Sequence, residues 1–463
     1  MTRRATGWAL LVGFATILLW NGCSGLSGLD SPNAGRTEAY EPGLPHFDME
    51  AVATLRDEER GLDVYAGVSP STLIFAQTDT LFAARYTLTF RVLDEQGRRT
   101  EAFQEQADTL VLADPTAAHR VERVRHHARF LLPPGRYVVE AMLEDRGTTE
   151  VAVRRQRLEV PDSSAFWLER PLVYAEGDSL PLMALHLPSE GPRRSVRAAY
   201  HRLPTGARIT SGLFRVTIDT TVATPPFWLG ASRGSLVYRG IEDLEAFGDT
   251  VLIEETSPAE PSGAQTLALP RLDEGLYQFV VEAKDADRST LARETRLVSI
   301  KAPDFPRVTT LDALIDALAY IAYPREQEFI RAGETPGERR LRFDAFWGSL
   351  VSDRGVAADL LRQYYERVED ANLLFTEAKA GWKTDRGMIY IIFGTPSYVE
   401  QTFEGAVWHY PSSTQDPASV FTFERVRGGA TQDAFEHYVL IRQPIYERAW
   451  VRALERWRRG EAF

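Results

Sequence analysis

Most of the chain between residues 46 and 302 alternates apolar and polar positions with a period of two. Residues 62–68 (LDVYAGV) show this alternation, and so do residues 86–92 (YTLTFRV), which lead into the turn-forming residues 94–97 (DEQG). Because successive side chains of a strand point to opposite faces, this pattern predicts strands with one face on a core and one in water. The region is therefore predicted to be antiparallel β-structure.

A repeated segment divides this β-region. Residues 132–145 and residues 272–287 each contain a glycine followed two positions later by a tyrosine, which opens an apolar strand. This arrangement resembles the tyrosine corner of immunoglobulin-like and fibronectin-like sandwiches. We therefore predict two tandem all-β sandwich domains of this kind, and one large irregular β domain is the alternative.

Beyond residue 303 the apolar spacing becomes helical. Leu311, Leu314 and Leu318 lie on one helical face, and Thr309 with Asp312 fits a capping box at its start. Further helices are predicted from residue 336, over residues 356–368 and after residue 444. Strands are predicted at residues 388–393, 407–410, 420–423 and 437–441. Helices grouped before strands indicate an α+β domain with a mainly antiparallel sheet.

The N-terminus has the three parts of a secretory signal. Arg3 and Arg4 precede an apolar run from Trp8 to Trp20, which is shorter than the roughly 20 residues of a membrane span. The small residues around Cys23 resemble the lipobox of bacterial lipoproteins, in which the cysteine receives a diacylglycerol. We therefore predict that Cys23 is the lipid attachment site, with an uncleaved anchor or a simple secreted form as alternatives.

Cysteine usage supports the same interpretation. Cys23 is the only cysteine, so an intrachain disulfide is impossible, and lipid attachment gives this thiol a role outside the cytoplasm. Ser24 after the cysteine resembles the outer-membrane sorting signal of enteric bacteria. We expect an exported protein anchored to a bacterial membrane, with the outer membrane favoured over the inner one.

The charge of the chain argues against one class of partner. The formal net charge is −12 at pH 7, whereas a nucleic-acid surface needs clustered positive charge. We therefore expect no nucleic-acid partner. Only four of the 53 basic residues are lysines, namely Lys284, Lys301, Lys379 and Lys383, and a GC-rich genome is the simple explanation.

No catalytic signature is recognisable. The adjacent His126 and His127 are expected on opposite faces of a strand, which disfavours a shared metal. His409 and His437 lie in predicted strands and could meet across the sheet, although buried, hydrogen-bonded histidines are the simpler interpretation. The sequence contains no HExxH motif, phosphate loop, dinucleotide fingerprint or nucleophile elbow. We predict no catalytic residue, no metal and no cofactor, while a pair of distant carboxylates stays possible.

One motif resembles a known family. Residues 381–387 read Gly381-Trp382-Lys383-Thr384-Asp385-Arg386-Gly387, with matching segments at 370–376, 389–391, 394–396 and 408–410. This pattern resembles the GWxTD domain family of bacterial envelope proteins, over about residues 310–463. The family is defined by the motif and lacks an established activity, so the resemblance implies no catalytic residues.

The motif residues also have a direct physical interpretation. Thr384, Asp385 and Gly387 are turn formers, Asp385 can accept a backbone N–H two residues on, and Gly387 permits a positive φ before a strand. Trp382 is expected to pack over the edge of the sheet. A helix-to-strand turn is the favoured interpretation. The alternative makes Trp382, Asp385 and Arg386 the floor of a ligand groove beside the loop 394–396.

These observations lead to one functional hypothesis and one rival. The preferred hypothesis is a non-catalytic, lipid-anchored cell-envelope protein that binds an envelope protein or a glycan through its C-terminal domain. The rival is an envelope hydrolase with a carboxylate or Ser/His site in that domain. The predicted parts are a signal peptide (1–22), a flexible tether (23–45), two β-sandwiches (46–162 and 163–302) and a GWxTD-like α+β domain (303–463).

Overall fold

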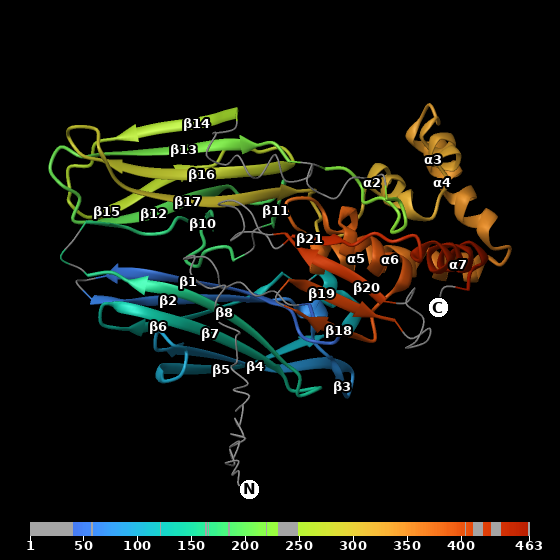
Figure 1. Cartoon of the computed structure of the whole chain (residues 1–463), viewed down its shortest axis with the longest axis horizontal. Coiled ribbons are helices and arrows are strands. Elements are labelled where there is room, and N and C mark those ends of the chain that lie inside the picture. The colour runs from blue at the N-terminus through green and yellow to red at the C-terminus, as the bar shows by residue number, and fades with distance from the viewer. Residues whose placement is uncertain are drawn as a thin grey trace, which may run out of the picture.

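The chain folds into two β units and a C-terminal domain of helices and strands (Figure 1). The computed structural model describes residues 40–461, except 57–58, 121, 163, 165, 184–185, 219, 230–248, 403, 411–419 and 427–436. The predicted signal peptide and Cys23 lie outside the described residues. Among the residues that are described, no helix has the length and apolar composition needed to cross a membrane.

The first β unit consists of two sheets that enclose one core. Its strands are β1 (Phe47–Arg56), β2 (Glu59–Val68), β3 (Ala76–Thr78), β4 (Leu81–Leu93), β5 (Thr100–Leu112), β6 (Val124–Leu131), β7 (Gly135–Asp145) and β8 (Val151–Val160). One sheet has the order β1-β2-β6, and the other has β3-β4-β7-β8 with β5 paired to β4. Leu62 and Val64 of one sheet and Leu88 and Phe90 of the other belong to the same fully buried cluster. The predicted alternation in residues 62–68 and 86–92 therefore lies on real strands.

The second β unit repeats this arrangement. Its strands are β9 (Trp167–Leu168), β10 (Leu172–Ala175), β11 (His186–Pro188), β12 (Arg194–His201), β13 (Arg208–Val216), β14 (Asp249–Thr256), β15 (Gly263–Ala268), β16 (Gly275–Lys284) and β17 (Thr290–Lys301). One sheet has the order β10-β12-β15, with β9 paired to β12, and the other has β11-β17-β16-β13-β14. The pairing β1-β2-β6 thus corresponds to β10-β12-β15, and β5-β4-β7-β8 corresponds to β14-β13-β16-β17.

The two tyrosines of the repeat make equivalent hydrogen bonds. The hydroxyl of Tyr137 donates to the carbonyl of Pro133 (3.0 Å), and that of Tyr277 donates to the carbonyl of Asp273 (3.0 Å). In each case the bond fixes the turn before a central strand, β7 or β16. The sequence repeat therefore corresponds to a repeated structural feature.

The β units lie one beside the other, joined by a buried ion pair (Figure 1). Arg296 of β17 donates to both carboxylate oxygens of Glu50 in β1, at 2.7 and 2.9 Å. Their side chains are 2% and 0% exposed. A small apolar cluster that includes Val52 and Leu172 lies in the same interface.

The C-terminal domain packs helices against a four-stranded antiparallel sheet. The helices are α2 (Leu311–Ala317), α3 (Pro324–Arg331), α4 (Pro336–Leu350), α5 (Arg354–Phe375), α6 (Asp385–Phe393) and α7 (Tyr446–Arg459). The sheet has the order β18 (Tyr398–Gln401), β19 (Gly405–His409), β20 (Val420–Arg425) and β21 (Tyr438–Leu440). Tyr364 and Val368 of α5, Trp408 of β19 and Trp457 of α7 share one core. The predicted order, helices and then an antiparallel sheet, describes this domain.

Two local predictions in this domain are wrong. Residues 388–393, predicted to be a strand, form the end of α6, because the segment is buried on every side and has no polar face to mark a helical period. The cap of α2 is Thr310, whose side chain accepts from the N–H of Ala313, while Thr309 donates to Asp304 instead.

Candidate functional site

The motif residues 381–387 lie between α5 and α6, in direct backbone contact with α5. Residues Gly381–Lys383 form a short 3-10 helix, and α6 begins at Asp385. A Cβ atom on Gly381 would lie 1.8 Å from the carbonyl oxygen of Ala371, and one on Gly387 would lie 1.9 Å from that of Gly381. Both glycines are therefore required by close packing of backbone on backbone.

Side chains from two helical segments hold the first half of the motif. Asn372 of α5 accepts a hydrogen bond from the N–H of Trp382 (3.2 Å), and the hydroxyl of Thr376 accepts one from Gly381 (2.8 Å). The hydroxyl of Tyr320 donates to the carbonyl of Trp382 (2.7 Å). Trp382 is buried. These bonds fix the first half of the motif in place, so its role is structural.

Thr384 caps α6. Its hydroxyl accepts from the N–H of Gly387 (3.0 Å) and donates to the carbonyl of Gly381 (2.8 Å). Threonine is a preferred N-cap because its oxygen satisfies an N–H that has no partner within the helix. One side chain therefore closes the turn and starts the helix.

Asp385 links the start of α6 to the end of the sheet. Its carboxylate accepts hydrogen bonds from the N–H of Leu440 (2.8 Å) and from two nitrogens of Arg442 (3.0 and 2.6 Å). The two charged side chains are only 10% and 11% exposed. Arg442 also donates to the carbonyl of Thr224 (3.1 Å), in the segment between β13 and β14. The aspartate of the motif therefore holds three distant parts of the chain together.

Arg386 lies in a buried polar cluster with Glu377 and His437. Its guanidinium is 3.4 Å from a carboxylate oxygen of Glu377, and it lies over the ring of Tyr438 at 4.0 Å. Glu377 also hydrogen-bonds Nδ1 of His437 and accepts from the N–H of Tyr438 (3.3 Å). All of these groups are buried, so the cluster is held away from bulk water.

Burial changes the protonation of this cluster. Desolvation raises the pKa of Glu377 to about 7, against the opposing effect of Arg386 and Lys379. Burial also lowers the pKa of His437 to about 3. Burial therefore favours the uncharged form of both side chains. Such a pair is chemically able to exchange a proton with a substrate that reaches it.

The predicted roles of the motif residues need correction in three places. Asp385 bonds across to Leu440 and Arg442 rather than to a backbone N–H two residues on. Gly387 lies inside α6, where close packing and not a positive φ explains it. Trp382 packs among helices instead of over a sheet edge, with its ring beside that of Tyr320 (6.3 Å between centroids).

The predicted loop 394–396 follows α6 and is bonded to Tyr390 of that helix and to Tyr410. Gly394 has φ +83° and accepts a hydrogen bond from the hydroxyl of Tyr410 (2.9 Å). The nearby ring of Tyr40 packs against Phe375 (4.8 Å) and Trp408 (5.4 Å), and burial raises the pKa of Tyr40. Tyr40 thus packs on Phe375 and Trp408 of the domain core.

The histidines do not form a common centre. His409 stacks on Tyr398 (4.1 Å), whereas His437 bonds Glu377, so the two do not meet across the sheet. His126 hydrogen-bonds Tyr86, and His127 hydrogen-bonds Asp63. Within the described parts of the chain, no three His, Cys, Asp or Glu side chains are grouped as metal ligands would be.

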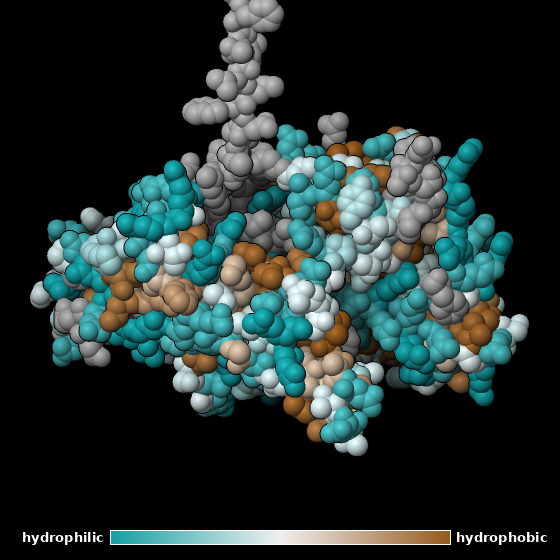
Figure 2. Space-filling view, turned by 90° about the horizontal axis from the view of Figure 1, so that it is seen from below, coloured by the Kyte–Doolittle hydropathy of each residue, from teal (hydrophilic) through white to brown (hydrophobic). Residues whose placement is uncertain are grey.

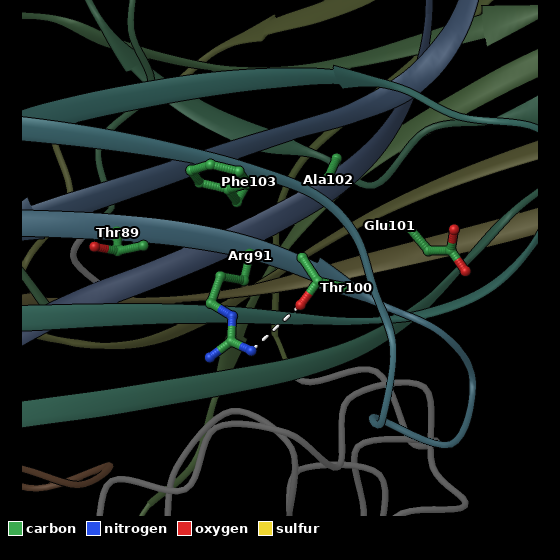
Figure 3. A pocket seen from close by; sticks show the side chains of 6 residues that line it. All are labelled: Thr89, Arg91, Thr100, Glu101, Ala102 and Phe103. Atoms are coloured by element: carbon green, nitrogen blue, oxygen red, sulfur yellow. Dashed lines mark hydrogen bonds between the residues drawn. The ribbon is translucent and has the colours of Figure 1, made fainter.

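A shallow hollow lies on the outer face of the first β unit. Figure 3 shows that Arg91 of β4 is hydrogen-bonded to Thr100 of β5 (3.3 Å), with Phe103 above the same sheet. Phe103 is 70% exposed, and Arg91 also pairs with Glu140 (3.1 Å). Figure 2 shows a mostly hydrophilic face with separate hydrophobic patches. Because its charged groups are already paired, the hollow offers little that would select a ligand.

Sequence reasoning missed Glu377 and Arg442. Glu377 lies 60 positions from His437, and Arg442 lies 57 positions from Asp385. No local pattern signals contacts at such a separation. The indirect signal was a carboxylate shortly before the motif and an arginine directly after the apolar residues 438–441.

The comparisons with known proteins give a family match and distant matches to solved structures. The crystal structure of red sea bream transglutaminase matches with a TM-score of 0.17 and 10% sequence identity, over 55% of this chain and 31% of that chain. A similarity this low supports no conclusion about fold or function. No curated protein matches the chain.

The family model agrees with the motif. The GWxTD domain model matches residues 280–459, a range that begins within β16 and includes β17 and the helices α2 to α7. The motif itself, with its two close-packed glycines and its capping threonine, lies within this range. The C-terminal region of the chain is therefore a GWxTD domain, of a family whose function is not established.

Proposed function

We propose that this protein is a non-catalytic, lipid-anchored component of the bacterial cell envelope whose C-terminal domain binds an envelope protein or a glycan. The observation that carries the proposal is the use of the motif side chains. Thr384, Asp385 and Arg386 are each engaged in bonds that hold the domain together. A motif used in this way fits a domain that presents a surface to a partner.

The β units fit the role of a support. We propose that they are immunoglobulin-like or fibronectin-like sandwiches of the predicted boundaries, 46–162 and 163–302. The repeated strand pairing and the bonds of Tyr137 and Tyr277 support this assignment. Because the two β units pack side by side through Glu50 and Arg296, they form one wide support and are not arranged end to end.

The experiment tests which part of the intact protein meets a partner. A photoreactive amino acid replaces one exposed residue at a time in the full-length protein: Leu341 (70% exposed) or Tyr398 (53%) in the C-terminal domain, and Phe103 (70%) in the first β unit. In intact envelopes, we expect crosslinked products from the C-terminal positions. Loss of a product after glycosidase treatment would identify a glycan. Crosslinks from the Phe103 position alone would contradict the proposal.

One observation favours the rival, an envelope hydrolase. Burial raises the pKa of Glu377, and a buried carboxyl bonded to a histidine is the kind of group that serves in acid–base catalysis. The test uses the full-length protein and purified cell-wall glycan as substrate. Release of reducing ends by the wild type and not by Glu377→Gln would favour the hydrolase. Equal results for the two proteins would exclude this pair as the catalyst.

A further inference from the structure

A cavity of about 360 Å³ lies between the second β unit and the GWxTD motif. Its walls come from the end of β13, the start of β16, the end of β17 and residues 378–383. The volume is at the lower end of the range for pockets that hold small ligands, roughly 300–1,000 Å³. The cavity adjoins the Glu377–His437 cluster, because Ala378 and Lys379 of its wall directly follow Glu377, and it is separate from the hollow at Phe103.

Positive side chains dominate this cavity. Lys301, Lys379, Lys383 and Arg215 line it. Lys301 and Lys379 are only 8% and 9% exposed. Within the described residues each ammonium group is bonded only to a backbone carbonyl: that of Ala378 (2.8 Å) for Lys301, and that of Thr221 (3.0 Å) for Lys379. An ammonium group has three N–H donors, so both retain capacity for another acceptor.

The basic residues that line the cavity outnumber the acidic ones. Glu274 and Asp249 lie on its wall, but within the described residues no carboxylate comes within 4.0 Å of the ammonium groups of Lys301, Lys379 or Lys383. Lys383 instead lies over the ring of Trp382, at 5.2 Å. Buried charges are normally paired, since an unpaired one carries a large desolvation cost. Four basic side chains against two carboxylates leave the described wall of the cavity with an excess of positive charge, which favours an anion.

The amino-acid composition shows that lysine is concentrated at this cavity. The chain has only four lysines among 53 basic residues, and three of them line this one cavity. The preference of the genome for arginine does not explain lysine at these positions. Lysine provides a compact point charge with rotatable donors, suited to phosphate and similar oxyanions. All three also lie within the region matched by the GWxTD model.

We propose that this cavity is a binding site for a small, multiply charged oxyanion, a phosphate-bearing or polycarboxylate compound held by Lys301, Lys379 and Lys383. The site is independent of the partner-binding surface proposed above. Because Lys301 ends β17 and the other two lysines precede or belong to the motif, the bound anion would join the second β unit to the motif.

The protonation of Lys301 adds a second, independent signature. Burial lowers its pKa to about 7, Lys383 lowers it further, and Glu274 opposes this effect. Among the lining residues that the structure describes, Lys379, Arg215 and Asp249 are the other charged groups. A bound anion favours the charged form of Lys301, so binding is accompanied by proton uptake. Affinity is therefore highest below pH 7 and falls as the pH rises above 7.

The test measures anion binding by calorimetry with the full-length protein in detergent. Pyrophosphate represents the phosphate class and citrate the polycarboxylate class, and the tighter ligand identifies the source. Lys301→Met and Lys383→Met should each weaken binding roughly tenfold or more, since each removes a charged donor. Lys284→Met is the matched control, because Lys284 lies outside the cavity and pairs with Glu282. If Lys301→Met does not fold, Lys383→Met still tests the proposal, because Lys383 is partly exposed.

The pH dependence of the affinity is measured with sulfate, because the charge of sulfate is constant across neutral pH. Wild type and Lys383→Met should lose affinity as the pH rises above 7, and Lys301→Met should not. Absence of saturable binding to any of the three anions at millimolar concentration would overturn the proposal. Equal affinity of the pocket variants and the wild type, or an equal loss in Lys284→Met, would overturn it as well.

Discussion

The ion pair between Asp385 and Arg442 should determine the stability of the GWxTD domain. The two side chains are almost fully buried and share two hydrogen bonds, and Asp385 accepts a third from Leu440. Replacing Asp385 by alanine leaves the guanidinium of Arg442 inside the protein without its carboxylate. Removing one partner of a buried ion pair typically costs about 3–5 kcal/mol. Because Arg442 keeps its bond to the carbonyl of Thr224, we expect the lower part of this range.

Such a loss is visible in a melting experiment. For a domain of this size, 1 kcal/mol corresponds to about 2–4 °C, so the melting temperature should fall by roughly 6–15 °C. Tryptophan fluorescence is a suitable probe of the unfolding of the C-terminal domain. Five of the nine tryptophans lie there, at positions 347, 382, 408, 450 and 457. The matched control is Asp344→Ala, which removes an exposed aspartate paired with Arg340 and should cost at most about 1 kcal/mol.

A double-mutant cycle separates the pair from other effects. Asp385→Ala and Arg442→Ala should each destabilise the domain, and the double variant should lose clearly less than the sum of the two. If Asp385→Ala melts like Asp344→Ala but no longer binds the partner found by crosslinking, the motif is a recognition site. That result would refute the structural role argued for Asp385.

Three further predictions follow from other features. Metabolic labelling with a fatty acid should mark the wild type and not Cys23→Ala; equal labelling of both would remove the proposed anchor. Gly381→Ala should abolish the cooperative melting of the GWxTD domain, since the new Cβ meets the carbonyl of Ala371. The control is Gly348→Ala, whose Cβ has no atom within 4 Å; this variant should melt at or above the wild-type temperature. Fragments 46–162 and 163–302 should each give β-type circular dichroism and melt cooperatively alone, and failure of both unless joined would mean that the β region is one domain.

The sequence predicted the β units well because their information is local. Each strand carries its own alternation, and the two glycine–tyrosine pairs identify the repeat and the bonds of Tyr137 and Tyr277. The error at residues 388–393 has the opposite cause. A segment that is buried on every side has no polar face, so its apolar, β-branched residues resemble a strand. The capping threonine at position 384 was the available signal for a helix.

The candidate site depends on contacts that no local pattern encodes. Glu377 meets His437, and Asp385 meets Arg442, only after the sheet has folded back onto α6. The lysine cavity likewise needs β17 of one unit to face the motif of another. The unusual distribution of four lysines was present in the sequence, but their convergence became apparent only in three dimensions.

The packing of Tyr40 has a mechanical consequence. The described chain begins at this residue, whose ring lies against Phe375 and Trp408 and whose carbonyl accepts from Gln401 (3.1 Å). Only afterwards does the chain enter β1 at Phe47. If Cys23 is held in a membrane, any pulling force reaches the GWxTD domain through Tyr40 before it reaches either β unit. The contacts of Tyr40 with Phe375 and Trp408 would then carry that force first.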